Sequence, residues 1–266
     1  MSEITIVTAF FDIGRGSWSP SQGLPAYLQR TTDTYFERFA NMASLENEMV
    51  IFTSEDLVEK VREIRGDKKT HINVIDFSKS FNEYRTKISD VQNNVEYLKK
   101  INLSQIKNPE YWNADYVLVN ALKSTFVKTA IDKGQITNDL VAWLDFGYCR
   151  TKETLNGVKR WYYPFDKDKI HLFNLKEYDG QYIEQIISNN DVHITGPCIV
   201  AGREMWPLLE KGVFWSLEKL LENNLVDDDQ TLLLMSYLLD KSKFELHPVS
   251  PNDWFVAFKD YNETAN

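Results

Sequence analysis

The chain has 266 residues, of which 43% are apolar and 26% are charged. This composition excludes a disordered or fibrous protein and allows one large α/β domain. Its formal net charge of -9 argues against nucleic acid as the main partner, because a phosphate backbone is bound by clustered Lys and Arg. The two cysteines, Cys149 and Cys198, indicate no disulfide framework. We expect no signal peptide and no membrane span, and hence a cytoplasmic protein; peripheral contact with the inner face of the membrane stays open.

Alternating strand and helix patterns fill the first part of the chain. Residues 4–11, 48–53 and 73–77 are short apolar runs typical of buried strands. Residues 25–43 have helical spacing, and Ser54 fits the N-cap of a second helix. This order predicts a parallel sheet with right-handed crossovers, in which ligands bind at the carboxyl ends of the strands.

The rest of the chain also contains patterns typical of helices and strands. We interpret residues 78–113 as a polar helical excursion that either contacts an acceptor or is simply a solvated face. The further expected elements are a helix at 116–131, a strand at 140–146, short strands and loops at 150–180, a strand within 191–202, helices at 205–221 and 229–239, and closing segments at 244–249 and 254–258. No repeat or low-complexity linker interrupts them, so we predict a single domain over residues 1–266.

The sharpest local feature is W-L-D-F-G-Y at residues 143–148. An acid at the end of a buried strand is unfavourable unless it is paired or bound to a cation. Gly147 permits a tight turn or close ligand approach, so Asp145 would present its carboxylate at the edge of the sheet. A Mn²⁺ or Mg²⁺ ion that bridges a diphosphate needs such a hard oxygen ligand. The alternative is an Asp that only starts a turn.

The end of the first strand and the loop after it suggest a nucleotide site. Backbone groups of Thr8, Ala9 and Phe10 could hold a nucleobase. Arg15, between two glycines, could reach a phosphate with its fork of donors. The loop matches no established phosphate-binding motif, so an ordinary structural loop is the alternative.

Four other positions are weaker candidates. Asp229 ends an acidic run at 227–229 and could bind a sugar hydroxyl or act as a base, although acids also cap helices. His247 could supply a nitrogen ligand to the metal at Asp145, or be structural. Lys123 could neutralise phosphate, or lie at the surface. Gly202 ends a strand and could let a bound sugar approach the backbone.

Four segments carry a family resemblance over nearly the whole chain. They are I-T-I-V-T-A-F-F-D-I-G-R-G at 4–16, L-Q-R-T-T-D-T-Y at 28–35, E-N-E-M-V-I-F-T-S at 46–54 and W-L-D-F-G-Y at 143–148. In these segments the chain resembles the HtrL/YibB family, a bacterial group associated with gene clusters for the lipopolysaccharide core and surface polysaccharides. The layout is similar to that of GT-A-type glycosyltransferases.

The resemblance implies a GT-A-like, Rossmann-related α/β fold with a mostly parallel central sheet flanked by helices. Residues 1–148 would form the nucleotide-sugar-binding half, and residues 149–266 the acceptor-binding half. Asp145 matches the first Asp of the Asp-x-Asp metal motif, but Gly147 replaces the second. One carboxylate must therefore suffice, or His247 must help. Asp229 and the next residue resemble the Asp-Gln pair that opens a helix in some retaining members.

We therefore predict a metal-dependent glycosyltransferase that uses Mn²⁺ or Mg²⁺. It would move a hexosyl residue from a nucleotide diphosphate sugar, UDP-linked by preference, to a bacterial surface glycan. Lipopolysaccharide, lipooligosaccharide, capsule or a lipid-linked glycan would be the acceptor. One alternative is a catalytically decayed protein that only binds nucleotide or carbohydrate, and another is a nucleotidyltransferase. Donor sugar, linkage, stereochemical course and oligomeric state stay open.

Overall fold

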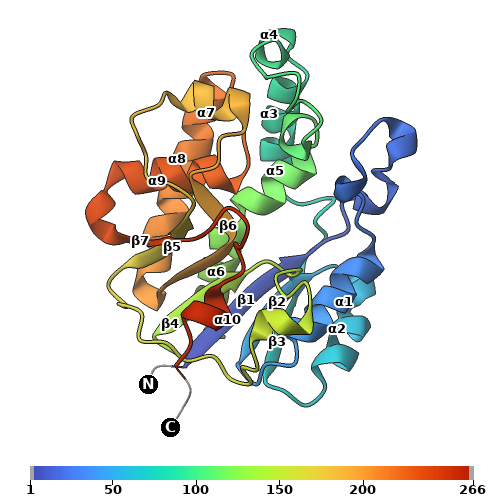
Figure 1. Ribbon diagram of the computed structural model, residues 1–266. Coiled ribbons are helices and arrows are strands. Elements are labelled where there is room, and N and C mark those ends of the chain that lie inside the picture. The colour runs from blue at the N-terminus through green and yellow to red at the C-terminus, as the bar shows by residue number, and fades with distance from the viewer. Residues whose placement is uncertain (1–2, 264–266) are drawn as a thin grey trace.

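Apolar segments spread along the whole chain form the strands of one sheet. The computed structural model describes residues 3–263, and within this range seven strands are joined in the order β3-β2-β1-β4-β6-β5-β7 (Figure 1). The strands are β1 (Ile4–Phe10), β2 (Met49–Thr53), β3 (Thr70–Val74), β4 (Leu140–Leu144), β5 (Ile170–Asn174), β6 (Ile194–Gly202) and β7 (Phe244–Pro248). The sheet therefore runs through both halves of the chain.

The sheet is mixed, with mostly parallel pairs. β1 pairs parallel with β2 and β4, β2 pairs parallel with β3, and β5 pairs parallel with β7. β6 runs antiparallel to both of its neighbours, β4 and β5. The predicted α/β fold with a mostly parallel sheet is confirmed. The reversal of β6 brings its N-terminal end to the edge where β1 and β4 finish.

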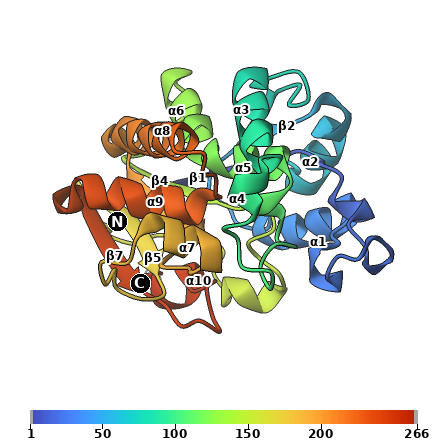
Figure 2. The same cartoon turned by 90° about the horizontal axis from the view of Figure 1, so that it is seen from above.

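Helices cover both faces of the sheet, because successive strand residues point to opposite sides and both sides are apolar (Figures 1 and 2). Val7 and Trp143 face one core, whereas Ile6 and Leu144 face the other. The helices in the described range are α1 (Thr32–Met42), α2 (Val58–Arg65), α3 (Asn82–Gln92), α4 (Val95–Leu98), α5 (Ala114–Ala121), α6 (Lys123–Asp132), α7 (Ile183–Asn189), α8 (Trp206–Glu222), α9 (Asp229–Leu239) and α10 (Ala257–Asp260).

The two helical layers differ in composition. Helices α3, α5, α6, α8 and α9 pack on the face of Trp143, and α8 lies beside both α6 and α9. Helices α1, α2 and α10 pack on the face of Leu144. In Figure 2, where the molecule is seen from above, α6, α8 and α3 lie at the opposite side of the view from α10. Among the described residues, no helix combines the length and the apolarity that crossing a bilayer requires.

Three element boundaries differ from the sequence prediction. The strand expected at 73–77 is β3, three residues earlier, and the helix expected at 25–43 begins only at Thr32. Thr31 caps that helix by accepting a hydrogen bond from the backbone N–H of Thr34 at 3.2 Å. The helix expected at 116–131 is interrupted at Leu122, where ψ is -1°. This break starts a new helix at Lys123, whose side chain is buried.

Candidate active site

A cavity of about 260 Å³ opens at the edge where β1 and β4 end and β6 begins. Parallel strands of an α/β sheet place ligands at this edge. Its charged lining residues are Asp12, Arg15, Arg30, Arg38, Lys123, Asp145, Arg150, Asp228 and Asp229. The cavity combines these charges with aromatic walls, so it suits a ligand with anionic and ring-shaped parts.

Lys123 lies at the centre of the polar floor of this cavity. Its ammonium nitrogen is 2.7 Å from Oδ2 of Asp229 and 2.9 Å from Oδ1 of Asp145. It also donates a hydrogen bond to the backbone carbonyl of Gly196 at 3.0 Å. These three contacts use all three donors of the ammonium group. The side chains of Lys123 and Asp229 are 6% and 7% exposed, so water screens their ion pair little, whereas the Asp145 side chain is 40% exposed.

These ion pairs affect the pKa values of Lys123 and Asp229. Burial lowers the pKa of Lys123, but the carboxylates of Asp145 and Asp229 outweigh it, and the net shift is upward. Burial raises the pKa of Asp229, while Lys123 opposes that shift. The positive charge of Lys123 is thus fixed over the whole physiological pH range. It neutralises part of the negative charge that the two carboxylates present to the cavity.

Asp145 is held by its neighbours but still faces the cavity. The indole N–H of Trp143 donates to its Oδ1 at 2.9 Å, and Lys123 contacts the same oxygen. The side chain is 40% exposed. Within residues 3–263, its Oδ2 has no hydrogen-bond partner. One carboxylate oxygen is therefore available to a ligand or a cation.

The three acidic residues at the start of α9 have different hydrogen-bond and ion-pair partners. Asp228 is the N-cap, and its Oδ1 accepts from the backbone N–H of Gln230 at 3.1 Å. Asp227 accepts from the hydroxyl of Thr231 at 2.6 Å. Asp229 alone of the three pairs with Lys123. Capping therefore explains Asp228, whereas the position of Asp229 depends on the cavity.

Gly196 leaves the space that Asp229 occupies. A Cβ atom at position 196 would lie 1.9 Å from Oδ2 of Asp229, which no side chain allows. The carbonyl of Gly196 also binds Lys123. Strand β6 therefore contributes a carbonyl that binds Lys123 and, at the same glycine, the space that the Asp229 carboxylate fills.

Four arginines also line the cavity: Arg15, Arg30, Arg38 and Arg150. Arg15 donates to the hydroxyl of Tyr35 at 2.8 Å and to the carbonyl of Leu28 at 3.2 Å, and its Nε is buried without a partner in residues 3–263. Burial and then Arg30 lower the pKa of Arg38. No arginine of the cavity lies within ion-pair distance of a carboxylate in the described part of the chain. These arginines are therefore suited to an anionic ligand.

Aromatic side chains complete the walls. Trp254 and Phe255, in the segment after β7, are half-buried and line the cavity. The guanidinium of Arg150 lies 4.4 Å from the ring centre of Phe255. Tyr116, on α5, lines the same cavity. Such rings offer flat apolar surfaces on which a base or a sugar can stack.

Comparison with known proteins places the chain in a family. A family model described as "Bacterial protein of unknown function (HtrL_YibB)" matches residues 2–263. The chain belongs to the HtrL/YibB family. The resemblance seen in its motifs is thus confirmed. Protein HtrL of Escherichia coli (strain K12) is 41% identical over 262 residues, which are 97% of this chain and 92% of that protein.

A solved structure also resembles this HtrL/YibB protein, weakly. It is the apo form of mouse xyloside xylosyltransferase 1, with 11% identity and a TM-score of 0.43. The similarity covers 98% of this chain and 94% of the mouse chain. Because this similarity is weak, the function proposed below rests on the residues of the cavity.

Most of the residues that the sequence singled out meet in the cavity of this HtrL/YibB chain. Those that line it are Ala9, Phe10, Arg15, Lys123, Asp145, Gly147 and Asp229. Thr8 does not, because it is fully buried within β1. Gly147 packs tightly, since a Cβ there would lie 3.3 Å from the ring of Tyr35. Lys123 is not at the surface but is the most enclosed charge of the floor.

The structure does not bring Gly202 to the cavity. Gly202 pairs with Leu140 at the start of β4, whereas Asp145 follows the end of that strand. The physical reason is the antiparallel direction of β6, whose C-terminal end lies at the opposite edge of the sheet. A Cβ at position 202 would lie 1.8 Å from the carbonyl oxygen of Lys167. The close approach that this glycine allows is with the protein itself.

The expected shared metal site of Asp145 and His247 is not formed. His247 lies on β7, and strands β6 and β5 separate β7 from β4. Its Nε2 is 2.9 Å from Nδ1 of His171 instead. Within residues 3–263, the cavity holds no group of three His, Cys, Asp or Glu side chains close enough to bind one ion.

Sequence reasoning missed the arginines other than Arg15, and Gly196. Arg30 lies two residues before α1 and Arg38 lies within it, and both line the cavity. Within the helix expected at 25–43, their spacing of eight residues was a signal that both could face one direction. Gly196 follows Thr195 at the start of the β6 strand. Its role could be found only once the strand was known to be antiparallel.

Proposed function

We propose that this HtrL/YibB protein is a glycosyltransferase that uses a nucleotide diphosphate sugar, with a UDP-linked hexose as the preferred class of donor. The observation that carries the proposal is a group of arginines that form no ion pair within residues 3–263 and line the same cavity as Asp145 and Asp229, where β1 and β4 end. A diphosphate matches the arginines in charge and geometry. A surface glycan is the proposed acceptor, in line with the family resemblance.

Each wall of the cavity has a proposed task. Arg15, Arg30 and Arg38 hold the diphosphate, and positive charge there stabilises the leaving nucleotide as the glycosidic bond breaks. The end of β1, at Ala9 and Phe10, holds the base against backbone groups and a ring face. The rings after β7 leave an apolar surface for the acceptor sugar.

Asp229 and Lys123 position the reacting sugar. The Lys123 ion pair holds the Asp229 carboxylate in one orientation, because Lys123 is itself held by Asp145, which follows β4, and by the carbonyl of Gly196 on β6. From that position Asp229 accepts a hydrogen bond from a sugar hydroxyl. Its ionised form, stabilised by Lys123, is the form that accepts.

The free oxygen of Asp145 fits a single-carboxylate site for Mn²⁺ or Mg²⁺. Such ions are often bound by one or two carboxylates together with substrate phosphates. A bound ion would supply positive charge to the diphosphate. Lys123 already provides part of that charge, so metal dependence is a separate proposal from glycosyl transfer.

Nucleotide release from UDP-, GDP- and dTDP-sugars tests the proposal. We expect release from one class, and a loss of at least about 100-fold in Asp145→Asn, since a preorganised polar group contributes a few kcal/mol to the transition state. Asp139→Asn is the matched control, because Asp139 is exposed at the other end of β4. No release with any donor and acceptor mixture would overturn glycosyl transfer. Unchanged release in EDTA would overturn only the metal.

A second candidate is a binding protein that has lost catalysis. The two ion pairs of Lys123 favour it, because they neutralise the carboxylates that would otherwise bind a metal. Calorimetric titration with UDP separates the two proposals. Tight, metal-independent binding that Asp145→Asn leaves unchanged, together with no nucleotide release, supports the binding protein.

A further inference from the structure

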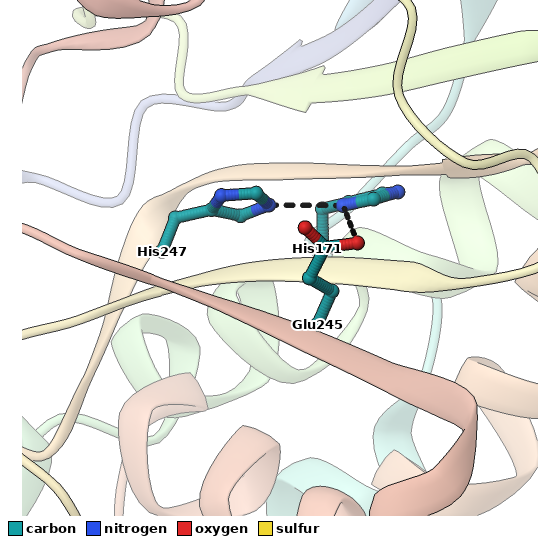
Figure 3. Close-up of side chains that lie close together, drawn as sticks. All are labelled: His171, Glu245 and His247. Carbon is teal, nitrogen blue, oxygen red and sulfur yellow. Dashed lines mark hydrogen bonds and ion pairs between the residues drawn. The ribbon is translucent and has the colours of Figure 1, made fainter.

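Two histidines and a glutamate meet on the sheet face opposite to Lys123. His171 is on β5, and Glu245 and His247 are on β7, which is paired with it in parallel (Figure 3). Glu245 and His247 are two residues apart on one strand, so their side chains share a face. Among residues 3–263 this is the single group of three potential metal ligands whose binding atoms all lie within 4.8 Å of one another.

The atoms of this group converge on one point. Nδ1 of His171 is 2.9 Å from Nε2 of His247 and 3.6 Å from Oε2 of Glu245 (Figure 3). His171 is 1% exposed and His247 is 9% exposed, whereas the Glu245 side chain is 51% exposed. The two nitrogens are therefore enclosed, and the carboxylate provides access from solvent.

The hydrogen bond on the far side of His171 fixes which nitrogen is free. Nε2 of His171 lies 2.8 Å from the backbone carbonyl of Asp166. A carbonyl only accepts, so Nε2 carries the proton and donates it. In the neutral ring, Nδ1 then has its lone pair, and this lone pair points at His247. Metal-binding histidines have this arrangement, in which the other ring nitrogen donates to a carbonyl or a carboxylate.

We propose that His171, Glu245 and His247 form a second metal site, for Zn²⁺ or a similar divalent transition ion, separate from the cavity. Nδ1 of His171, Nε2 of His247 and a carboxylate oxygen of Glu245 are the ligands, and water completes the tetrahedron. Imidazole nitrogens suit Zn²⁺ better than Mg²⁺ or Ca²⁺. Bonds of about 2.0–2.1 Å place tetrahedral ligand atoms about 3.3 Å apart, so the two nitrogens separate by a few tenths of an ångström on binding.

The surroundings favour a structural role for the ion. The rings of Phe165, Phe173 and Tyr261 pack against the two imidazoles. An ion here would link the edge strand β7 to β5. The chain continues from β7 to Trp254 and Phe255 in the cavity wall. The site would therefore hold in place the segment that forms this wall.

A simple hydrogen bond is the competing explanation. The neutral His247 ring can donate its Nε2–H to the Nδ1 lone pair of His171, and this needs no ion. The two explanations differ in what the group does with added metal. A hydrogen-bonded pair binds Zn²⁺ no better than an isolated surface histidine.

Calorimetric titration of the untagged full chain with Zn²⁺, after EDTA has been removed, tests the site. We expect one ion per chain, a rise in Tm, and four-coordinate visible absorption when Co²⁺ replaces Zn²⁺. His247→Gln and Glu245→Gln should each weaken binding about 10- to 100-fold or more, since each removes a ligand. Glu245 is half exposed, so its variant remains folded and keeps the test valid if the histidine variant does not fold.

Two control variants make the result specific. His193→Gln changes a buried histidine outside the group, and Asp145→Asn changes the cavity; both should bind Zn²⁺ as the parent chain does. The proposal is overturned if the parent chain binds no stoichiometric Zn²⁺. It is also overturned if Glu245→Gln and a folded His247→Gln bind normally, or if binding is lost in Asp145→Asn. None of these readouts depends on glycosyl transfer.

Discussion

Nζ of Lys123 lies 2.7 Å from Oδ2 of Asp229, so one ion pair joins helices α6 and α9 across 106 residues of sequence. The same ammonium contacts Asp145 after β4 and the carbonyl of Gly196 on β6. A single buried charge therefore links four elements at the floor of the cavity. Its contribution to stability and its contribution to function can be separated by mutation.

Replacement of Lys123 by Met should destabilise the fold by about 3–5 kcal/mol. The change leaves the buried carboxylate of Asp229 without a partner, and breaking one side of a buried ion pair has a cost of this size. The double variant Lys123→Met/Asp229→Asn should regain part of this loss, because no buried charge remains unpaired. Urea denaturation measures both.

Lys128→Met is the matched control for this change. Lys128 is on the same helix and pairs with Asp132, whose side chain is 57% exposed. Such pairs contribute about 0–1 kcal/mol. If Lys123→Met and Lys128→Met had similar free energies of unfolding, the central role of the Lys123 pairs would be wrong.

Gly196→Ala should displace Asp229 and reduce nucleotide-sugar turnover about 10-fold or more. The added methyl would lie 1.9 Å from Oδ2 of Asp229, so the carboxylate must move away from Lys123. A misplacement of about 1 Å can have a 100-fold effect on rate. Gly16→Ala is the control, since its methyl would meet nothing closer than 3.7 Å. Equal turnover in the two variants would contradict the proposed position of Asp229.

The sequence predicted the strands better than their directions. The apolar runs at 4–11, 48–53 and 140–146 correspond to β1, β2 and β4, because buried parallel strands are continuous apolar segments. The strand within 191–202 was also expected, but its apolar pattern does not encode direction. For this reason Gly202 was predicted to line the cavity, whereas the structure places Gly196 there. Because β6 runs antiparallel to β4, its N-terminal glycine lies where β4 ends and its C-terminal glycine lies where β4 begins.

The position of Asp145 could be predicted, but its partners could not. An acid that directly follows a buried strand, two residues before a glycine, is expected where the strands of the sheet end. By contrast, the contacts of Lys123 depend on how α6 and α9 pack against each other. These helices are far apart in the sequence, so no local sequence pattern predicts the contacts. His247 was expected beside Asp145 because nothing in the sequence indicates that β7 is an outermost strand of the sheet, with β6 and β5 between it and β4.

Arg38→Gln should weaken UDP binding about 10- to 100-fold. Hydrogen bonds to charged groups contribute about 1.5–3 kcal/mol, and the diphosphate is the proposed partner of this arginine. The loss should be smaller at high salt, because the remaining charges are screened. Arg62→Gln, which removes an exposed arginine on α2 that pairs with Glu59, is the control. Equal affinities for UDP in these two variants would exclude Arg38 from the diphosphate site.

Glu110→Gln should change how stability depends on pH. Glu110 is 4% exposed, and burial, with Asp227 as the second cause, raises its pKa to about 8. Burial also raises the pKa of Asp227, to about 7. In the unfolded chain both carboxyls ionise near pH 4. Between these pH values the unfolded chain binds fewer protons than the folded chain, so the free energy of unfolding falls as the pH rises from about 4 to about 8.

Glutamine cannot ionise, so Glu110→Gln leaves Asp227 as the one carboxyl of this pair that titrates. The slope of the unfolding free energy should flatten by up to about 1.4 kcal/mol per pH unit, the value for one proton. The gain over the parent chain should be largest at pH 8 and vanish near pH 4. Urea denaturation at several pH values measures it, with Glu59→Gln as the control, because the Glu59 side chain is 84% exposed. Parallel curves for the parent chain and Glu110→Gln would mean that the carboxyl of Glu110 has the same pKa in the folded and unfolded chains, and would contradict the upward shift that burial causes.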